Sequence, residues 1–104
     1  MREICLVHLD KTRPAVVLTR EPTRFAMTKV TIAPITSTIK GLSSEVLLGP
    51  ANGLDRECAI SADNILTVRQ DTLGRTIGYL TEPQEKQLAQ AIIFAFDLRA
   101  PLAR

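Results

Sequence analysis

The feature that most constrains the fold is a change of hydrophobic period about three quarters of the way along the chain. Up to about residue 80, apolar residues occur in short runs or alternate with polar ones. Residues 29–33, for example, place Val30 and Ile32 on one face of an extended strand. Beyond residue 80, apolar residues recur at steps of three and four, which gathers them on one face of a helix. That face comprises Leu88, Ala91, Ile92, Ala95 and Phe96. The sequence therefore predicts a mainly β domain with one C-terminal amphipathic helix.

The expected strands are short and closely spaced. Val, Ile and Thr make up a quarter of the chain, a composition that favours pleated structure. Pro14 is tolerated only near the start of its strand. The expected strands are residues 3–9, 14–19, 29–33, 45–48, 58–61 and 75–80. Short strands with turn signals about every ten residues indicate a small antiparallel barrel or sandwich.

The ends of the helix carry their own signals. Thr81 followed by Gln84 fits a capping box, and Pro83 stands in the first turn, where its missing N–H costs nothing. Pro101 is expected to stop the helix.

Length and composition limit the class of protein. A chain of 104 residues is expected to form one domain spanning residues 1–104, and a net charge of +2 does not by itself predict a nucleic-acid partner. The longest apolar run, 91–96, is far shorter than the roughly 20 residues of a membrane span, so no membrane association is expected. The N-terminus lacks the features of a signal peptide, which predicts a cytoplasmic protein.

The metal-binding and nucleophilic residue types are scarce. Cys5 and Cys58 lie far apart in sequence and are expected to be buried thiols. His8, the one histidine, lies within an apolar strand as a partly exposed polar member, with no nucleophile motif nearby. We therefore expect no metal ion and no cofactor.

Two polar features each leave two interpretations open. Arg13 precedes Pro14 at the entrance of an apolar strand; it is either a solvated strand end or a guanidinium held rigidly for bidentate contact with phosphate. Residues 36–38 are three consecutive hydroxyl residues after a strand. They are either turn residues or groups that hydrogen-bond a phosphodiester or unstacked bases.

Several segments resemble the successive signatures of MazF/PemK-type toxins, the growth-arresting endoribonucleases of bacterial toxin–antitoxin pairs. These segments are residues 13–19, 33–37, 41–48, 59–65 and 77–80, followed by the terminal helix. Each is weak alone, but together they stand in order and at the family's spacing over essentially the whole chain. The resemblance implies an SH3-like antiparallel barrel with a C-terminal helix, assembled as a homodimer. It also implies a cognate antitoxin as partner, with a disordered tail that folds in the toxin's groove.

The resemblance further implies metal-independent cleavage of single-stranded RNA, in which the 2′-OH attacks and leaves a cyclic phosphate and a 5′-OH. The family's essential arginine falls on Arg13, where it stabilises the charge on the phosphorus. Its essential threonine falls on Thr36, which orients the phosphate. The candidate RNA-binding residues are Ser37, Thr19, Arg20, Lys40 and Asp63; for Asp63 a structural role stands equally open.

The sequence departs from the family pattern in the first strand and in the loop after it. Cys5 stands where members usually carry tryptophan, and Asp10-Lys11-Thr12 replaces a longer loop that covers the RNA groove. Ser61 stands where a relative has arginine beside the acidic segment. A shorter loop leaves the groove open to structured RNA, such as tRNA or rRNA loops, as well as to mRNA.

Two alternative functions remain at this stage. The first is a CcdB-type toxin, which has the same barrel but binds DNA gyrase and cleaves nothing. The second is a relative that binds RNA without cleaving it. Arg13 beside a hydroxyl cluster favours the nuclease, because a gyrase binder has no need to hold a phosphate.

Overall fold

The computed structural model describes residues 2–20 and 26–99. In this part of the chain the strands are β1 (Glu3–His8), β2 (Thr12–Val17), β3 (Lys29–Thr36), β4 (Glu45–Leu48), β5 (Cys58–Ser61), β6 (Leu66–Arg69) and β7 (Leu73–Tyr79). Short 3-10 turns η1 (Pro50–Asn52), η2 (Ala62–Asn64) and η3 (Gln70–Thr72) separate some of them, and α2 (Glu82–Ala95) follows. The predicted mainly β fold with one C-terminal helix is confirmed.

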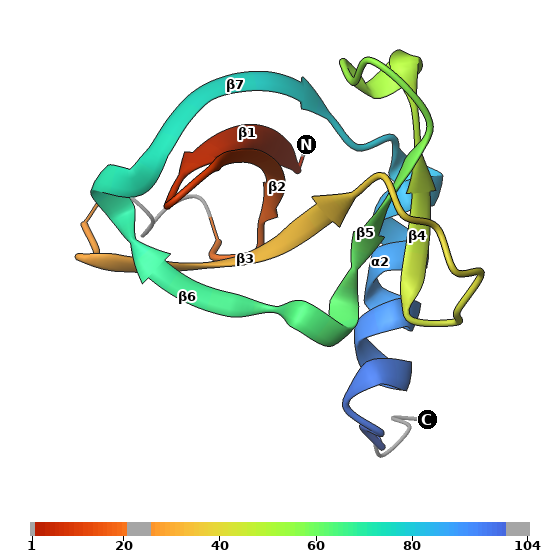
Figure 1. The fold of residues 1–104 in the computed structure, drawn as a ribbon. Coiled ribbons are helices and arrows are strands. Elements are labelled where there is room, and N and C mark those ends of the chain that lie inside the picture. The colour runs from red at the N-terminus through yellow and green to blue at the C-terminus, as the bar shows by residue number, and fades with distance from the viewer. Residues whose placement is uncertain (1, 21–25, 100–104) are drawn as a thin grey trace.

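The described strands form one antiparallel sheet in the order β4-β5-β3-β2-β1-β7, and β6 also pairs with β3. β7 arches over β1 and β2, while α2 lies beside β4 and β5, so the sheet curls into a half-barrel with the helix on one side (Figure 1). Residues 29–32 of β3 pair with β6, residues 32–34 pair with β2, and its last two residues pair with β5. This long strand therefore joins the two parts of the sheet.

Several strand boundaries differ from those expected. β6 was not predicted; it has only four residues, of which only Val68 is buried, and it pairs with Lys29–Ile32 of β3. β3 runs on through Pro34 to Thr36. Pro14 is the third residue of β2 rather than the first, since hairpin pairing extends outward to His8 and Thr12.

Two clusters of buried side chains form the core. The larger lies between the sheet and α2 and includes Ile4, Ile60 and Leu88; the smaller lies between β1, β2, β3 and β6. Cys5 and Cys58 are buried free thiols, as predicted. Leu88 and Ala91 are buried and Ile92 and Ala95 pack against the core, whereas Phe96 is 53% exposed. The predicted helical face is thus correct except for Phe96, which follows the last helical residue and so leaves the face.

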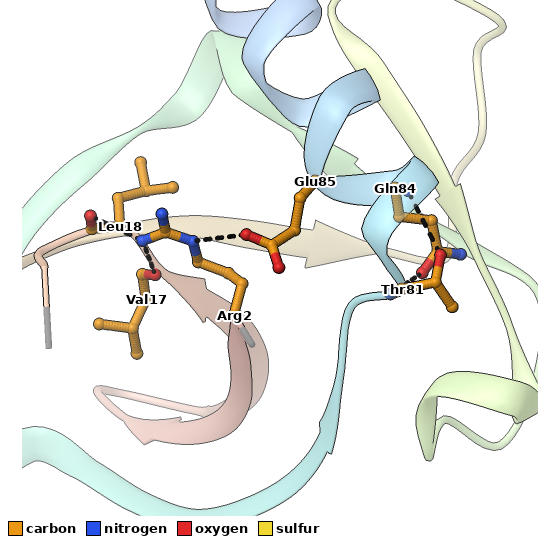
Figure 2. A network of polar contacts seen from close by, with 6 residues as sticks. All are labelled: Arg2, Val17, Leu18, Thr81, Gln84 and Glu85. Atoms are coloured by element: carbon orange, nitrogen blue, oxygen red, sulfur yellow. Dashed lines mark hydrogen bonds and ion pairs between the residues drawn. The ribbon is translucent and has the colours of Figure 1, made fainter.

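The start of α2 is fixed by hydrogen bonds on both sides (Figure 2). Gln84 N donates to Thr81 Oγ1 at 3.3 Å, and Thr81 N donates to Gln84 Oε1 at 2.9 Å, which confirms the predicted capping box. Arg2 Nη1 donates to the carbonyls of Val17 and Leu18 at 3.1 and 2.9 Å, and its Nε lies 4.0 Å from Glu85 Oε1. Arg2 therefore ties the ends of the first hairpin to the helix.

The helix ends at Ala95, and Asp97 follows with a positive φ of 51°. Pro101, the predicted stop, lies outside the described residues. No helix within residues 2–20 and 26–99 is long and apolar enough to cross a membrane.

Candidate active site

A cleft of about 470 Å³ lies where β1, β2, β3 and β7 meet the segment that follows η1. Its apolar floor continues the larger core cluster toward the surface and comprises Leu6, Pro14, Ile35, Leu54 and Ile77. Its polar rim comprises Arg13, Thr36, Ser37, Asp55, Arg56 and Arg75, and Gly53 and Cys58 complete the lining. We call it the arginine cleft.

Arg13 is positioned by the pairing of three strands. It stands opposite Val7 on β1, and the next two residues place Pro14 opposite Leu6 and Ala15 opposite Pro34. Since Pro14 has a fixed φ, the backbone just after the arginine is rigid. The Arg13 side chain makes no hydrogen bond or ion pair with any residue in the described part of the chain. An exposed guanidinium on a rigid backbone retains all five N–H donors for a ligand.

Thr36 and Ser37 stand on the same cleft at the end of β3. Thr36 Oγ1 accepts a hydrogen bond from the backbone N–H of Thr38 at 3.1 Å. This local bond ends the strand and fixes the hydroxyl oxygen, while the hydroxyl proton stays available to donate. Thus the structure brings Arg13 together with Thr36 and Ser37, which lie 23 and 24 positions further along the sequence.

Three charged residues of the rim were missed by the sequence analysis: Asp55, Arg56 and Arg75. With Arg13 they give the cleft three positive charges and one negative charge, a net charge of +2, which equals the net charge of the whole chain. The remaining residues are therefore neutral in sum. No local sequence pattern marks these residues. They reach the cleft because the segment after η1, with Asp55 and Arg56, lies beside β7, which carries Arg75.

The other predicted RNA-binding residues lie outside the arginine cleft. Thr19 and Arg20 line a separate hollow with Leu18, Met27 and Thr31, where Thr31 N donates to Thr19 Oγ1 at 2.8 Å.

Lys40 and Asp63 are also away from the cleft lining. The backbone N–H of Lys40 donates to the carboxylate of Glu45 at 3.2 Å. Asp63 accepts a hydrogen bond from the buried hydroxyl of Ser44. These contacts hold the segment between β3 and β4 in place.

Neither described cysteine nor the histidine is set up as a nucleophile or base. Cys58 borders the cleft, but burial raises the pKa of its thiol, and its Sγ donates to the carbonyl of Arg56 at 3.4 Å. His8 is exposed, as predicted; its Nδ1 lies 3.0 Å from Thr12 Oγ1, and it is not part of the cleft lining. Residues 2–20 and 26–99 contain no group of three or more His, Cys, Asp or Glu side chains placed to hold a metal ion.

The connection between β1 and β2 is short. Three residues, 9–11, join the two strands, and Leu9 N donates to the carbonyl of Lys11 at 3.3 Å. The hairpin thus closes tightly beside Arg13, and residues 9–11 are too few to fold over the cleft.

Comparison with solved structures defines the class of protein. The chain is similar to the Mycobacterium tuberculosis toxin MazF-mt6, with a TM-score of 0.92 and 48% identity over 95% of this chain and 100% of that one. It has the same fold as a mycobacterial endoribonuclease in complex with its cognate antitoxin, with a TM-score of 0.83, 23% identity and 95% of each chain covered. The curled sheet with its single C-terminal helix is therefore that of a small bacterial toxin, which confirms the barrel-type fold expected from the resemblance.

Sequence comparison then gives the family. Residues 2–96 match the family described as PemK-like, MazF-like toxin of type II toxin–antitoxin system. The chain is 50% identical over 98 residues to the endoribonuclease MazF3 of Mycobacterium tuberculosis, covering 94% of this chain and 95% of that protein. It is 33% identical over 86 residues to the probable endoribonuclease MazF5 of the same species, covering 82% and 79%. The chain belongs to the PemK/MazF family of toxins.

Proposed function

We propose that this protein is the endoribonuclease toxin of a toxin–antitoxin pair and cleaves single-stranded RNA in the arginine cleft without a metal ion or cofactor. The observation that carries the proposal is the convergence of Arg13, Thr36 and Ser37 on one cleft. The 50% identity to an endoribonuclease over nearly the whole chain supports it.

In the proposed reaction the 2′-oxygen of the substrate attacks the adjacent phosphorus. The bond from O2′ to phosphorus forms, the bond from phosphorus to O5′ breaks, and the 2′-OH proton is lost as O5′ gains one. The products are a cyclic phosphate and a 5′-OH. Arg13 stabilises the additional negative charge on the phosphorane oxygens, a role suited to a guanidinium whose donors have no partner among the described residues.

Thr36 and Ser37 orient the phosphate through their hydroxyl groups. Because Thr36 Oγ1 accepts from Thr38 N, the oxygen is held in place and its proton remains to be donated to a phosphate oxygen. Holding the phosphate in line with the 2′-OH supplies rate acceleration without any further reacting group, since near-attack geometry alone lowers the barrier.

The proposed partners are a cognate antitoxin and a second copy of the chain. One solved relative of the same fold is an endoribonuclease in complex with its cognate antitoxin, which supports the first. An RNA-cleaving toxin that arrests growth acts in the cytoplasm, where mRNA, tRNA and rRNA are found. The three-residue hairpin beside Arg13 supports access by structured RNA loops as well as unpaired mRNA.

The test is to incubate the antitoxin-free protein with total RNA in EDTA and to map 5′-OH ends. We expect cuts at one short motif, and we expect Arg13→Ala to abolish them, a loss of at least 100-fold, the scale seen when one transition-state donor is removed. Arg69→Ala is the matched control, since Arg69 is 71% exposed, pairs with Asp71 at 2.6 Å and lies outside the cleft.

Two outcomes would contradict the proposal. Absence of cuts from a folded wild-type protein that still binds RNA would identify a non-cleaving RNA-binding relative. Growth arrest that persists in Arg13→Ala would instead indicate a protein target such as DNA gyrase.

A further inference from the structure

We propose that Arg75 binds the phosphate next to the scissile one, so that the arginine cleft holds two consecutive phosphates of an RNA strand. The inference rests on the proposed function and deepens it. Besides Arg13 and Thr36, it adds a residue that contacts RNA only when the bound strand is longer than a dinucleotide.

The backbone of β7 is irregular where Arg75 stands. β1 and β7 pair Cys5 with Thr76 and Val7 with Leu73, so Leu6 alone faces both Gly74 and Arg75. Such a bulge re-aims a side chain relative to the regular alternation of a strand, and bulges are frequent beside binding sites. Leu6 belongs to the floor of the arginine cleft and Arg75 to its rim. The bulge therefore brings Arg75 to the cleft.

Gly74, the residue before Arg75, lies close against β1 at this bulge. A Cβ at Gly74 would overlap the imidazole of His8 and lie 3.3 Å from the carbonyl oxygen of Leu6. His8 itself is held by Thr12 at the base of the first hairpin. The residue before Arg75 is thus packed against β1, which fixes where the arginine side chain leaves the strand.

The strand order separates Arg75 from Arg13 by a distance that suits two phosphates. Arg75 lies on β7 opposite Leu6, Leu6 pairs with Pro14, and Arg13 precedes Pro14 on β2. Two strand spacings place the two backbone positions about 10 Å apart. Arginine side chains on either side of the floor can therefore each hold a different phosphate of one strand.

Arg75 has no acidic partner among the residues that the structure describes. Other arginines of the chain do have one: Arg69 pairs with Asp71 at 2.6 Å, and Arg2 lies 4.0 Å from Glu85. The cleft rim holds one acidic residue, Asp55, against the three arginines Arg13, Arg56 and Arg75. The rim therefore has an excess of positive charge, to which Arg75 contributes a guanidinium with no acidic partner among the described residues, and an anionic strand binds most strongly at such a site.

A phosphate that does not react is bound equally in the ground state and the transition state. Loss of Arg75 should therefore raise KM and leave kcat unchanged. Loss of an interaction with the scissile phosphate would instead lower kcat, as expected for Arg13. The two arginines are distinguishable by this split.

The experiment compares two substrates that carry the cleaved dinucleotide step identified by the cleavage map. One is the dinucleoside monophosphate, whose single phosphate is the scissile one, and the other is a tetranucleotide with a phosphate on each side of it. For the tetranucleotide, we expect Arg75→Ala to raise KM about tenfold or more, as for a charge-assisted hydrogen bond, and to leave kcat within twofold. For the dinucleotide, we expect Arg75→Ala and wild type to agree within twofold. Arg75→Lys should have a KM between those of wild type and Arg75→Ala for the tetranucleotide. Arg69→Ala should match wild type on both substrates.

Equal effects of Arg75→Ala on both substrates would overturn the inference, because Arg75 would then act on the scissile phosphate. No effect on either substrate would also overturn it. If the wild type makes no cuts in total RNA, the proposed function fails; in that case, or if it cuts total RNA but neither short substrate, the inference is judged by binding of an unlabelled RNA octamer. There the negative slope of log affinity against log salt concentration should become shallower by about 0.7 in Arg75→Ala, the value for one phosphate contact on a single strand. An unchanged slope would overturn it.

Discussion

At the scale of single residues, two glycines decide whether the wall of the arginine cleft can form. A Cβ on Gly78 would overlap the carbonyl oxygen of Asn52, and one on Gly53, whose φ is +87°, would overlap the carbonyl of Ile77. The backbones of η1 and β7 therefore cross in direct contact. The buried side chain of Asn52 secures the crossing, since its Nδ2 donates to Tyr79 O at 2.9 Å and to Gln84 Oε1 at 2.7 Å.

Gly78→Ala should destabilise the protein by about 3 kcal/mol or more, because two backbone segments, rather than a flexible side chain, would have to separate. Urea unfolding followed by circular dichroism measures this loss. Gly49→Ala is the control, since Gly49 has extended backbone and no atom within 4 Å of an added Cβ, so we expect a change within about 0.5 kcal/mol. Equal stability of Gly78→Ala and wild type would contradict the close crossing.

The crossing also explains which site residues the sequence could predict. Arg13, Thr36 and Ser37 belong to segments with a recognisable local pattern, and the structure places them on one cleft. Arg56 and Arg75 stand in no such pattern. Arg56 follows Gly53, where η1 crosses β7, and Arg75 stands at a bulge that is defined only by the pairing of β7 with β1. Tertiary contacts, which a single sequence does not display, bring them to the site.

At the scale of elements, the segment that joins β3 to β4 is held by one carboxylate. Glu45, the first residue of β4, accepts hydrogen bonds from the backbone N–H groups of Lys40, Gly41 and Leu42, the shortest at 2.8 Å from Gly41. The segment begins at Ser37, on the rim of the cleft. Desolvation raises the pKa of Glu45, but these N–H donors and the charge of Lys40 outweigh it and lower the pKa below its ordinary value of 4.5.

This carboxylate should make stability depend on pH in the acid range. Because the pKa is lower in the folded state, the contribution is fully present above pH 4.5 and is lost as pH falls through the folded-state pKa. We expect Glu45→Gln to be less stable than wild type by about 1 kcal/mol at pH 7, the low end for charge-assisted bonds at a half-exposed site. Urea unfolding between pH 3 and 7 checks this. A difference that stays constant down to pH 3 would contradict the role of the charge.

Six of the seven strands and the helix were predicted from local signals, whereas β6 and the end of β3 were not. The capping box of Thr81 and Gln84 and the three- and four-residue spacing that follows define α2 from sequence alone. By contrast, β6 is only four residues long and buries only Val68, and it forms where β3 offers it an edge. β3 likewise extends past Pro34, since β5 pairs with Ile35 and Thr36.

At the scale of the whole molecule, apolar side chains remain exposed where α2 ends. Phe94 is 61% exposed, Phe96 53%, Leu98 52% and Ile93 46%, within a chain of only 104 residues. A cluster of large apolar side chains at the end of one helix marks an interaction surface. This surface supports the proposal that the protein works as a homodimer, because a partner that covers it removes several large side chains from water at once.

The homodimer gives the last prediction. Light scattering at micromolar concentration should yield a mass near 22.8 kDa, twice the 11.4 kDa of the chain. Phe94→Ser should shift the mass toward that of one chain while the circular dichroism spectrum stays unchanged, because Phe94 is exposed and contributes nothing to the described core. The control is Leu9→Ser, a similarly exposed apolar residue in the β1–β2 hairpin, on the opposite side of the molecule from α2 (Figure 1). A wild-type mass of 11.4 kDa would contradict the dimer, and a dimer disrupted by Leu9→Ser rather than Phe94→Ser would move the interface to the hairpin beside the arginine cleft.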